Sequence, residues 1–172
     1  MSTQTVVIET PRGRSEKFAF DPEAQAFVLR RVLPVGMVFP YDFGFVPETL
    51  AEDGDPVDVV VLSEFESFPG CRIECRIIGA LLARQTRQPK KKEPKSKQKR
   101  SRRMIRNDRL IAVPAVASAL DHVRSIDDLP DGVLSELEQF FVNYHEQEGT
   151  RYEPRGRASA REAKKLLARH EK

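Results

Sequence analysis

Short apolar runs, separated by Gly, Pro and Asp, fill the first half of the chain and predict β-strands joined by turns. The predicted strands cover Val6–Thr10, Lys17–Phe20, Ala26–Leu29, Asp58–Leu62 and Cys71–Leu82, with a further strand over Leu110–Val113. Their number and spacing are typical of a small barrel or sandwich.

The pattern becomes helical after Pro114. Apolar residues recur at the spacing of one helix face at Val133, Leu137, Phe140, Phe141 and Tyr144, which predicts a helix over residues 131–147. Ser159 and Glu162 have the spacing of a capping box and predict the start of a last helix. We therefore predict an α+β fold, in which a small, OB-like, five-stranded β-barrel carries flanking α-helices.

The bulk composition is that of an ordinary globular protein. A chain of 172 residues with 40% apolar side chains suffices for one domain, here residues 1–172. We expect no contact with a membrane, because no apolar run approaches the roughly 20 residues that span a bilayer. Cytoplasmic is the default localisation without a visible signal peptide. Cys71 and Cys75 are too far apart on one strand for a disulfide and fit a reducing compartment.

The net charge of +3 hides a basic segment at residues 84–106. This segment holds twelve Lys or Arg and one acid, Glu93, while the rest of the chain holds 17 basic and 25 acidic side chains. We predict a disordered loop insertion between two strands. One interpretation is a merely solvated loop, and the other is a non-specific contact of residues 87–103 with a polyanion such as nucleic acid or polyphosphate.

Three aspartates, Asp53, Asp55 and Asp58, lie within six residues in the segment Asp-Gly-Asp-Pro-Val-Asp. Gly54 and Pro56 predict a tight turn, so that two of the carboxylates lie on the turn and the third begins a strand. Carboxylates crowded in this way repel one another and are commonly neutralised by hard divalent cations. The composition predicts a site for Mg²⁺, with Mn²⁺ as the alternative, whereas the simpler reading is a solvated acidic turn.

The segment Val38–Leu62 resembles the signature region of the soluble family I inorganic pyrophosphatases. The family's D-G-D-P-x-D motif stands here as Asp53–Asp58, and the aromatic loop that precedes it in the family corresponds to Phe39–Pro47. The resemblance implies Mg²⁺-dependent hydrolysis of pyrophosphate to two phosphates. It also implies a homo-oligomer, because many bacterial members form hexamers.

The resemblance further implies a role for each matching residue. Asp55 is the expected catalytic base, with Glu9 and Arg109 as further catalytic groups. Lys17, Arg31 and Tyr144 are expected to bind the phosphates. The expected metal ligands are Asp53, Asp55, Asp58 and Asp108.

Several positions depart from the family pattern. Phe43 stands where the aromatic loop usually has a tyrosine, and His145 stands where a lysine follows Tyr144. Asn107 and Arg109 occupy the positions of a late metal-binding aspartate and a lysine, so that Asp108 fits only after a shift of one residue. These departures leave two alternatives to an active pyrophosphatase. One is a weakened or inactive relative that binds phosphate or polyanions, and the other is a nucleic-acid adaptor that uses the basic loop.

Overall fold

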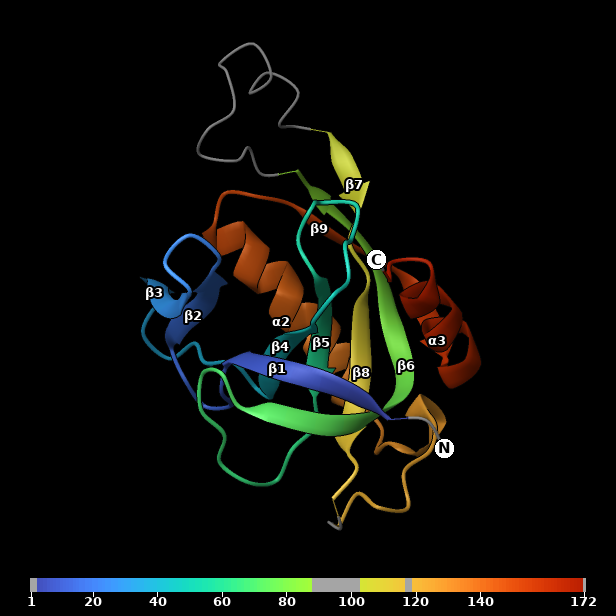
Figure 1. The fold of residues 1–172 in the computed structure, drawn as a ribbon. Helices are drawn as coiled ribbons and strands as arrows, with labels where there is room; N and C mark the ends of the chain where they lie inside the picture. Colours follow the sequence, from blue (N-terminus) through green and yellow to red (C-terminus); the bar gives the residue numbers. More distant parts are fainter. Residues whose placement is uncertain (1–2, 88–102, 117–118, 172) are drawn as a thin grey trace.

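The computed structural model describes residues 3–87, 103–116 and 119–171 (Figure 1). The strands are β1 (Gln4–Thr10), β2 (Glu16–Asp21), β3 (Ala26–Val32), β4 (Asp42–Val46), β5 (Val57–Val61), β6 (Arg72–Thr86), β7 (Met104–Arg106), β8 (Arg109–Pro114) and β9 (Tyr152–Ser159). The helices are α2 (Val133–Gln147), α3 (Ala160–Ala168) and the short 3-10 helix η2 (Ile126–Asp128). The described residues thus form mostly β-sheet with two α-helices, as the predicted α+β class requires.

The strand pairings of the main sheet return to their starting point. β1 pairs with β4, β4 with β5, β5 with β8, β8 with β6, and β6 again with β1. The pairing of β5 with β8 is parallel and the other four are antiparallel. β7 and β9 extend the sheet by pairing with β6, and β2 and β3 form a separate hairpin. The carboxylate-bearing turn before β5 and the residues that open β8 therefore lie on neighbouring strands.

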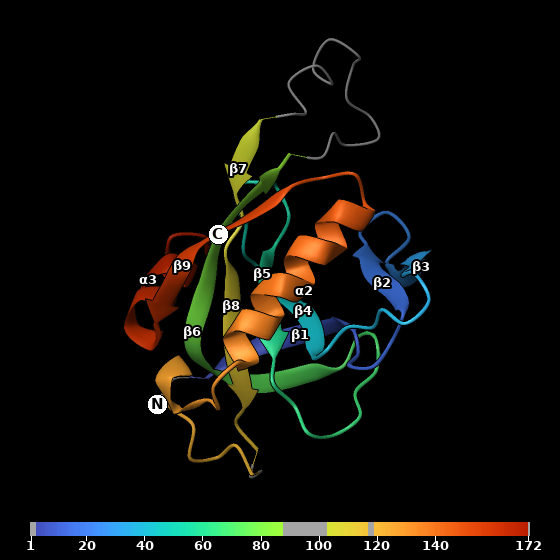
Figure 2. The same ribbon diagram turned by 180° about the vertical axis from the view of Figure 1, so that it is seen from behind.

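Two apolar clusters meet at β5, because successive side chains of a strand point to opposite faces. Val59 and Val61 belong to a cluster that includes Ala163 and Leu167 of α3. Val60 belongs to the other cluster, which includes Phe141 and Tyr144 of α2. Figure 2 shows α2 lying across the sheet, with the β2–β3 hairpin beside its C-terminal half. The packing of α2 thus carries its last turn toward that hairpin.

Both predicted helices are present. α2 begins two residues later than predicted and ends at Gln147, just before Gly149, which adopts a φ of 68°. The Ser159 side chain accepts from the backbone N–H of Glu162, and the Glu162 carboxylate accepts from the N–H of Ser159, so the predicted capping box starts α3. Among the described residues, no helix is long and apolar enough to cross a membrane.

The aromatic segment before the aspartates was predicted as a loop, and this was wrong for Asp42–Val46, which forms β4. Gly44 explains why a strand forms here. A Cβ at this position would lie 2.1 Å from the carbonyl oxygen of Val7, so only glycine lets β4 approach β1 this closely. Phe39 and Phe43 then pack against each other, with ring centres 5.9 Å apart, in the apolar cluster that includes Phe141 and Tyr144 of α2.

The two ends of the basic segment 84–106 are β-strand, so the prediction of a disordered loop was wrong for these residues. Arg84 pairs with Arg106, and Thr86 pairs with Met104, across the β6–β7 hairpin. β9, which the sequence pattern did not reveal, pairs with the same part of β6 and stabilises it through backbone hydrogen bonds. The rest of the predicted loop, residues 88–102, lies outside the described residues.

Candidate active site

The predicted acidic turn is present at residues 51–55. Gly54 adopts a φ of 85°, the backbone N–H of Asp55 donates to Oδ1 of Asp53 at 3.0 Å, and the N–H of Ala51 donates to the carbonyl of Asp55 at 2.7 Å. Asp58 follows on β5, opposite Phe45 of β4. The turn and strand therefore place two carboxylates on the loop and one on the sheet, as the sequence predicts.

Four acidic side chains share one electrostatic environment. The pKa of Asp58 is raised to about 7, mainly by burial and also by the charges of Asp53 and Glu9, against the opposing effect of Arg109 and Lys17. Burial also raises the pKa of Glu9, whose carboxylate accepts from the N–H of Phe20 at 2.8 Å and feels the charge of Asp55. Such mutual repulsion is relieved when a cation binds between the carboxylates.

A group of basic and phenolic side chains comes from the β2–β3 hairpin and the end of α2. Lys17 and Arg31 are paired positions of the hairpin. The Lys17 ammonium lies 5.2 Å from the ring centre of Tyr144, and the Arg31 guanidinium lies 4.5 Å from it. Arg31 Nε also lies 3.3 Å from Glu148 Oε1. The tertiary structure thus brings together the three residues that were predicted to bind phosphate.

This group of side chains carries hydrogen-bonding atoms that the described residues do not satisfy. They are the buried Nη2 of Arg31 and the buried hydroxyl of Tyr144, while the buried Nε of Arg31 makes no hydrogen bond beyond its ion pair with Glu148. Although burial lowers the pKa of Lys17, the neighbouring Tyr144, Glu148 and Asp58 raise it above its ordinary value, so the ammonium stays charged. Buried donors without partners are costly unless a ligand satisfies them.

Arg109, at the start of β8, is a buried cation, with only 4% of its surface exposed. Its guanidinium lies 4.2 Å from the ring centre of Phe141 and 4.8 Å from that of Tyr152. Arg109 Nη2 donates to Gln85 Oε1 at 3.4 Å and lies 3.3 Å from His145 Nε2.

The Nε atom of the Arg109 guanidinium faces the carboxylate of Asp58. Arg109 Nε lies 3.7 Å from Asp58 Oδ2, while Nε and Nη1 make no hydrogen bond within the described part of the chain. Arg109 thus lies between Asp58 and the aromatic rings of Phe141 and Tyr152, and two of its donors make no hydrogen bond within the described residues. Sequence reasoning included Arg109 but missed His145, Gln85 and Tyr152 as its partners, because they come from distant segments.

The structure does not bring Asp108 to the other three predicted metal ligands. Its carboxylate accepts from the backbone N–H of Ala83 at 3.1 Å and from Arg106 Nε at 2.5 Å. Its neighbour Asn107, only 5% exposed, points to the acidic group instead and donates from Nδ2 to Asp53 Oδ2 at 3.2 Å. The two-residue link between β7 and β8 thus directs the Asn107 amide to Asp53 and the Asp108 carboxylate to Ala83 and Arg106.

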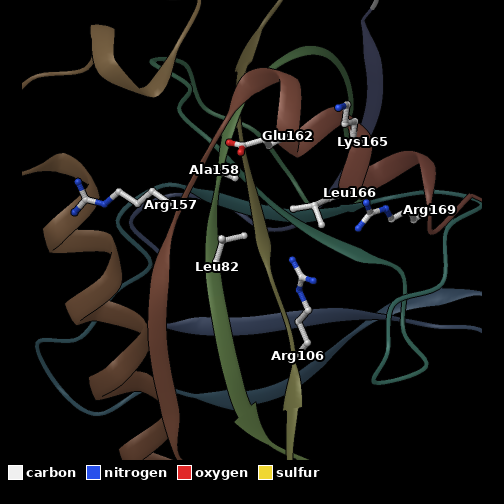
Figure 3. Close-up of a pocket in the computed structure, with 8 residues that line it drawn as sticks. All are labelled: Leu82, Arg106, Arg157, Ala158, Glu162, Lys165, Leu166 and Arg169. Atoms are coloured by element: carbon white, nitrogen blue, oxygen red, sulfur yellow. The ribbon is translucent and has the colours of Figure 1, made fainter.

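A hollow of about 210 Å³ lies elsewhere, between β6, β9 and α3, and includes none of the predicted site residues (Figure 3). Arg106, Arg157, Lys165 and Arg169 line it around an apolar floor that includes Leu82 and Leu166. Two of these cations already have carboxylate partners, since Arg106 pairs with Asp108 and Arg157 with Glu138. We assign no ligand to this hollow.

Crowded carboxylates facing buried, unsatisfied cations define a site for an anionic, phosphate-like ligand that arrives with a divalent cation. Comparison with known proteins is consistent with this class: the family model for inorganic pyrophosphatase matches residues 6–172. The chain belongs to the inorganic pyrophosphatase family.

Individual relatives match over most of their length. The inorganic pyrophosphatase of Thermus thermophilus is 40% identical over 139 residues, covering 81% of this chain and 70% of the relative. That of Leifsonia xyli is 33% identical over 168 residues, covering 97% and 93%. The crystal structure of the Thermus thermophilus protein superposes with a TM-score of 0.82 at 34% identity, covering 96% and 87%. The Helicobacter pylori enzyme superposes with a TM-score of 0.83 at 28% identity, covering 98% and 91%.

Members of this family use divalent metal ions, and the acidic group fits such an ion in its chemistry. The side chains of Asp53, Asp55 and Asp58 offer only hard oxygen ligands, and the pKa of Asp58 is raised mainly by burial and also by the negative charges of Asp53 and Glu9. Within the described ranges, no three His, Cys, Asp or Glu side chains form a ready-made ligand group. This arrangement suits an ion such as Mg²⁺, which keeps several waters and binds through one or two carboxylates together with substrate phosphates.

Proposed function

We propose that this chain hydrolyses inorganic pyrophosphate to two phosphates. The observation that carries the proposal is the set of buried atoms without hydrogen bonds on Arg31, Arg109 and Tyr144, beside the acidic turn and the buried carboxylate of Asp58 on β5. A highly charged phosphoanhydride supplies acceptor oxygens for the donors. The divalent cation that accompanies it supplies positive charge for the carboxylates.

Each cationic side chain has a role that follows from its free atoms. Lys17 and Arg31 hold one phosphate with the Tyr144 hydroxyl, since all three meet at one place in the structure. Arg109 has free donors at Nε and Nη1 for phosphate oxygens beside Asp58, and its charge stabilises the negative charge that develops on the leaving phosphate.

The acidic residues divide into metal ligands and a base. Asp53, Asp55 and Asp58 hold the divalent cation, for which we propose Mg²⁺, with Mn²⁺ as a substitute. When bound, that cation neutralises the substrate and lowers the pKa of a coordinated water. Asp55, on the exposed side of the turn, accepts the proton of the attacking water. Glu9 adds a further carboxylate beside Asp55.

The test is release of phosphate from Mg²⁺-pyrophosphate by the wild type and by Asp55→Asn. We expect the substitution to lower kcat by about 100-fold or more, because a general base contributes a factor of that size. Asp131→Asn is the matched control, since Asp131 is exposed and lies before α2, at the opposite end from Tyr144. A wild type that binds pyrophosphate but releases no phosphate with Mg²⁺ or Mn²⁺ would instead identify a non-catalytic phosphate-binding relative.

We also propose that the closed series of strand pairings forms a small OB-like barrel and that the chain assembles as a homo-oligomer, with six subunits expected from the family resemblance. Leu29 and Val32 on β3 and Val35 just after it are exposed apolar side chains, which a neighbouring subunit would cover. Light scattering after size-exclusion chromatography tests this, and a monomer at micromolar concentration would contradict it.

For residues 87–103 we propose a salt-sensitive contact with polyanions, supported by their charge alone. The two free cysteines support a reducing, cytoplasmic setting. Deleting residues 88–102, outside the described ranges, and measuring polyphosphate retention at rising salt tests the first proposal. Unchanged retention would exclude it.

A further inference from the structure

His145, in the last turn of α2, has no role in the reaction as proposed so far, yet it is only 5% exposed. Its ring stacks on Tyr152, with ring centres 5.2 Å apart and planes inclined by 11°. Both ring nitrogens have polar neighbours: Arg109 Nη2 at 3.3 Å from Nε2, and Thr150 Oγ1 at 3.0 Å from Nδ1. A buried histidine with both nitrogens engaged has a defined protonation state.

The neighbours of His145 decide which nitrogen carries the proton. A guanidinium can only donate, so Nε2 must be the acceptor facing Arg109. The hydroxyl of Thr150 donates to the backbone carbonyl of His145 at 3.0 Å, which leaves its lone pairs to accept from Nδ1–H. One tautomer, neutral and protonated on Nδ1, satisfies all three contacts.

The second proton of an imidazolium would point at a guanidinium. Burial, together with the charges of Arg109, Lys17 and Arg31, lowers the pKa of His145 to about 3. The ring is therefore a neutral acceptor throughout the range in which the enzyme is expected to work.

This acceptor controls the orientation of Arg109. One nitrogen, Nη2, is held by both His145 and Gln85, while Phe141 and Tyr152 flank the guanidinium. The guanidinium is planar, so holding Nη2 in that plane fixes the directions in which Nε and Nη1 donate. These two donors make no hydrogen bond within the described residues, and Nε lies 3.7 Å from Asp58 Oδ2.

We propose that His145 is a positioning residue, whose neutral Nε2 holds Nη2 of the Arg109 guanidinium so that the remaining donors, Nε and Nη1, stay available to phosphate oxygens of the substrate. The inference rests on the proposed function for the identity of the ligand. Its structural content, the tautomer and the coupling of His145 to Arg109, stands independently of turnover.

The experiment is a double-mutant cycle. His145→Leu removes the acceptor at similar size, His145→Gln restores an acceptor oxygen, and each is combined with Arg109→Lys. We expect His145→Leu to lower kcat/KM about tenfold or more, since it leaves a charged donor unsatisfied, and His145→Gln to recover to within about threefold of the wild type. In the Arg109→Lys background, His145→Leu should change kcat/KM by less than about twofold.

Two kinetic outcomes overturn the inference. Equal losses from His145→Leu in both backgrounds would show that it acts through the fold and not through Arg109. A His145→Gln variant as impaired as His145→Leu, with an unchanged Tm, would show that the acceptor is irrelevant. If the wild type releases no phosphate, the proposed function fails. The coupling of His145 to Arg109 is then measured with the same variants by their affinity for pyrophosphate, using calorimetry.

Nitrogen NMR of the ring gives a readout that needs no activity. We expect a neutral, Nδ1-protonated His145 between pH 5 and pH 8, and a change in its Nε2 shift on Arg109→Lys. An Nε2-protonated or doubly protonated ring in an active enzyme would overturn the inference and leave the proposed function standing.

Discussion

Asn107 donates a side-chain hydrogen bond from Nδ2 to Oδ2 of Asp53 at 3.2 Å, from a position that is 5% exposed. An amide therefore faces the acidic turn at the position where the family pattern has a metal-binding aspartate. The amide partly offsets the charge of Asp53 in the metal-free protein, whereas a carboxylate there would add to the repulsion.

Asn107→Asp should therefore make the protein more dependent on divalent cation. We expect a lower Tm without metal, because two carboxylates then face each other, and a larger rise in Tm on adding Mg²⁺ than in the wild type. Differential scanning fluorimetry across a Mg²⁺ titration measures both. Asn143→Asp, on the exposed face of α2, is the matched control. An equal Mg²⁺-induced shift in Asn107→Asp and the wild type would contradict this account of the site.

Tyr144→Phe should separate binding from stability. The Tyr144 hydroxyl is buried without a hydrogen-bond partner in the described structure, so its removal should change the free energy of unfolding by less than about 0.5 kcal/mol. The ring contacts with Phe39 at 5.6 Å and Phe140 at 5.9 Å remain.

The same substitution should raise KM for pyrophosphate about tenfold, because the hydroxyl is proposed to bind phosphate only in the complex. Urea unfolding and steady-state kinetics measure the two effects. Tyr41→Phe, in the segment before β4, serves as the control and should leave KM unchanged. A Tyr144→Phe variant with wild-type KM would remove Tyr144 from the phosphate site.

His145 should make the protein sensitive to acid. Its pKa is about 3 in the folded state and ordinarily about 6.5, so below pH 6.5 the unfolded chain binds a proton that the folded chain does not. The resulting penalty is absent above pH 6.5 and grows as pH falls toward 3.

The size of this penalty follows from the linkage relation. The free energy of unfolding of the wild type should fall, relative to His145→Gln, by about 1.4 kcal/mol for each pH unit below 6.5. Urea titrations of both proteins between pH 4 and pH 8 measure the difference, and carboxylates common to both cancel. Parallel curves for the two proteins would show that the folded ring titrates normally.

Gly44→Ala should destabilise the fold strongly. The added Cβ would lie 2.1 Å from the carbonyl oxygen of Val7 and 3.0 Å from the Cα of Ile8, so β4 and β1 must separate. We expect a loss of about 3 kcal/mol or more in the free energy of unfolding. Gly36→Ala, at a φ of 84° with open space around it, should cost only about 1 kcal/mol. Similar losses in the two variants would contradict a steric role for Gly44.

The sequence predicted those parts of the fold that depend on residues close together in the chain. The turn at Gly54, the stripe along α2 and the capping box at Ser159 involve residues a few positions apart, and all three were predictable. β4 and β9 were not, because Asp42–Val46 lies among prolines and aromatics and β9 contains Pro154 and Gly156. Both are strands because a neighbouring strand offers them backbone partners.

The sequence by itself therefore determined the family, the acidic turn and the identities of the charged residues expected to meet a phosphate ligand. Only the tertiary structure decided which way they face. Asn107 and Asp108 form the two-residue link between β7 and β8, in which Asn107 contacts Asp53 while Asp108 turns to Arg106. The surroundings of Arg109 were equally beyond the sequence, since Gln85, His145 and Tyr152 reach it from three distant segments that only the packed core brings together.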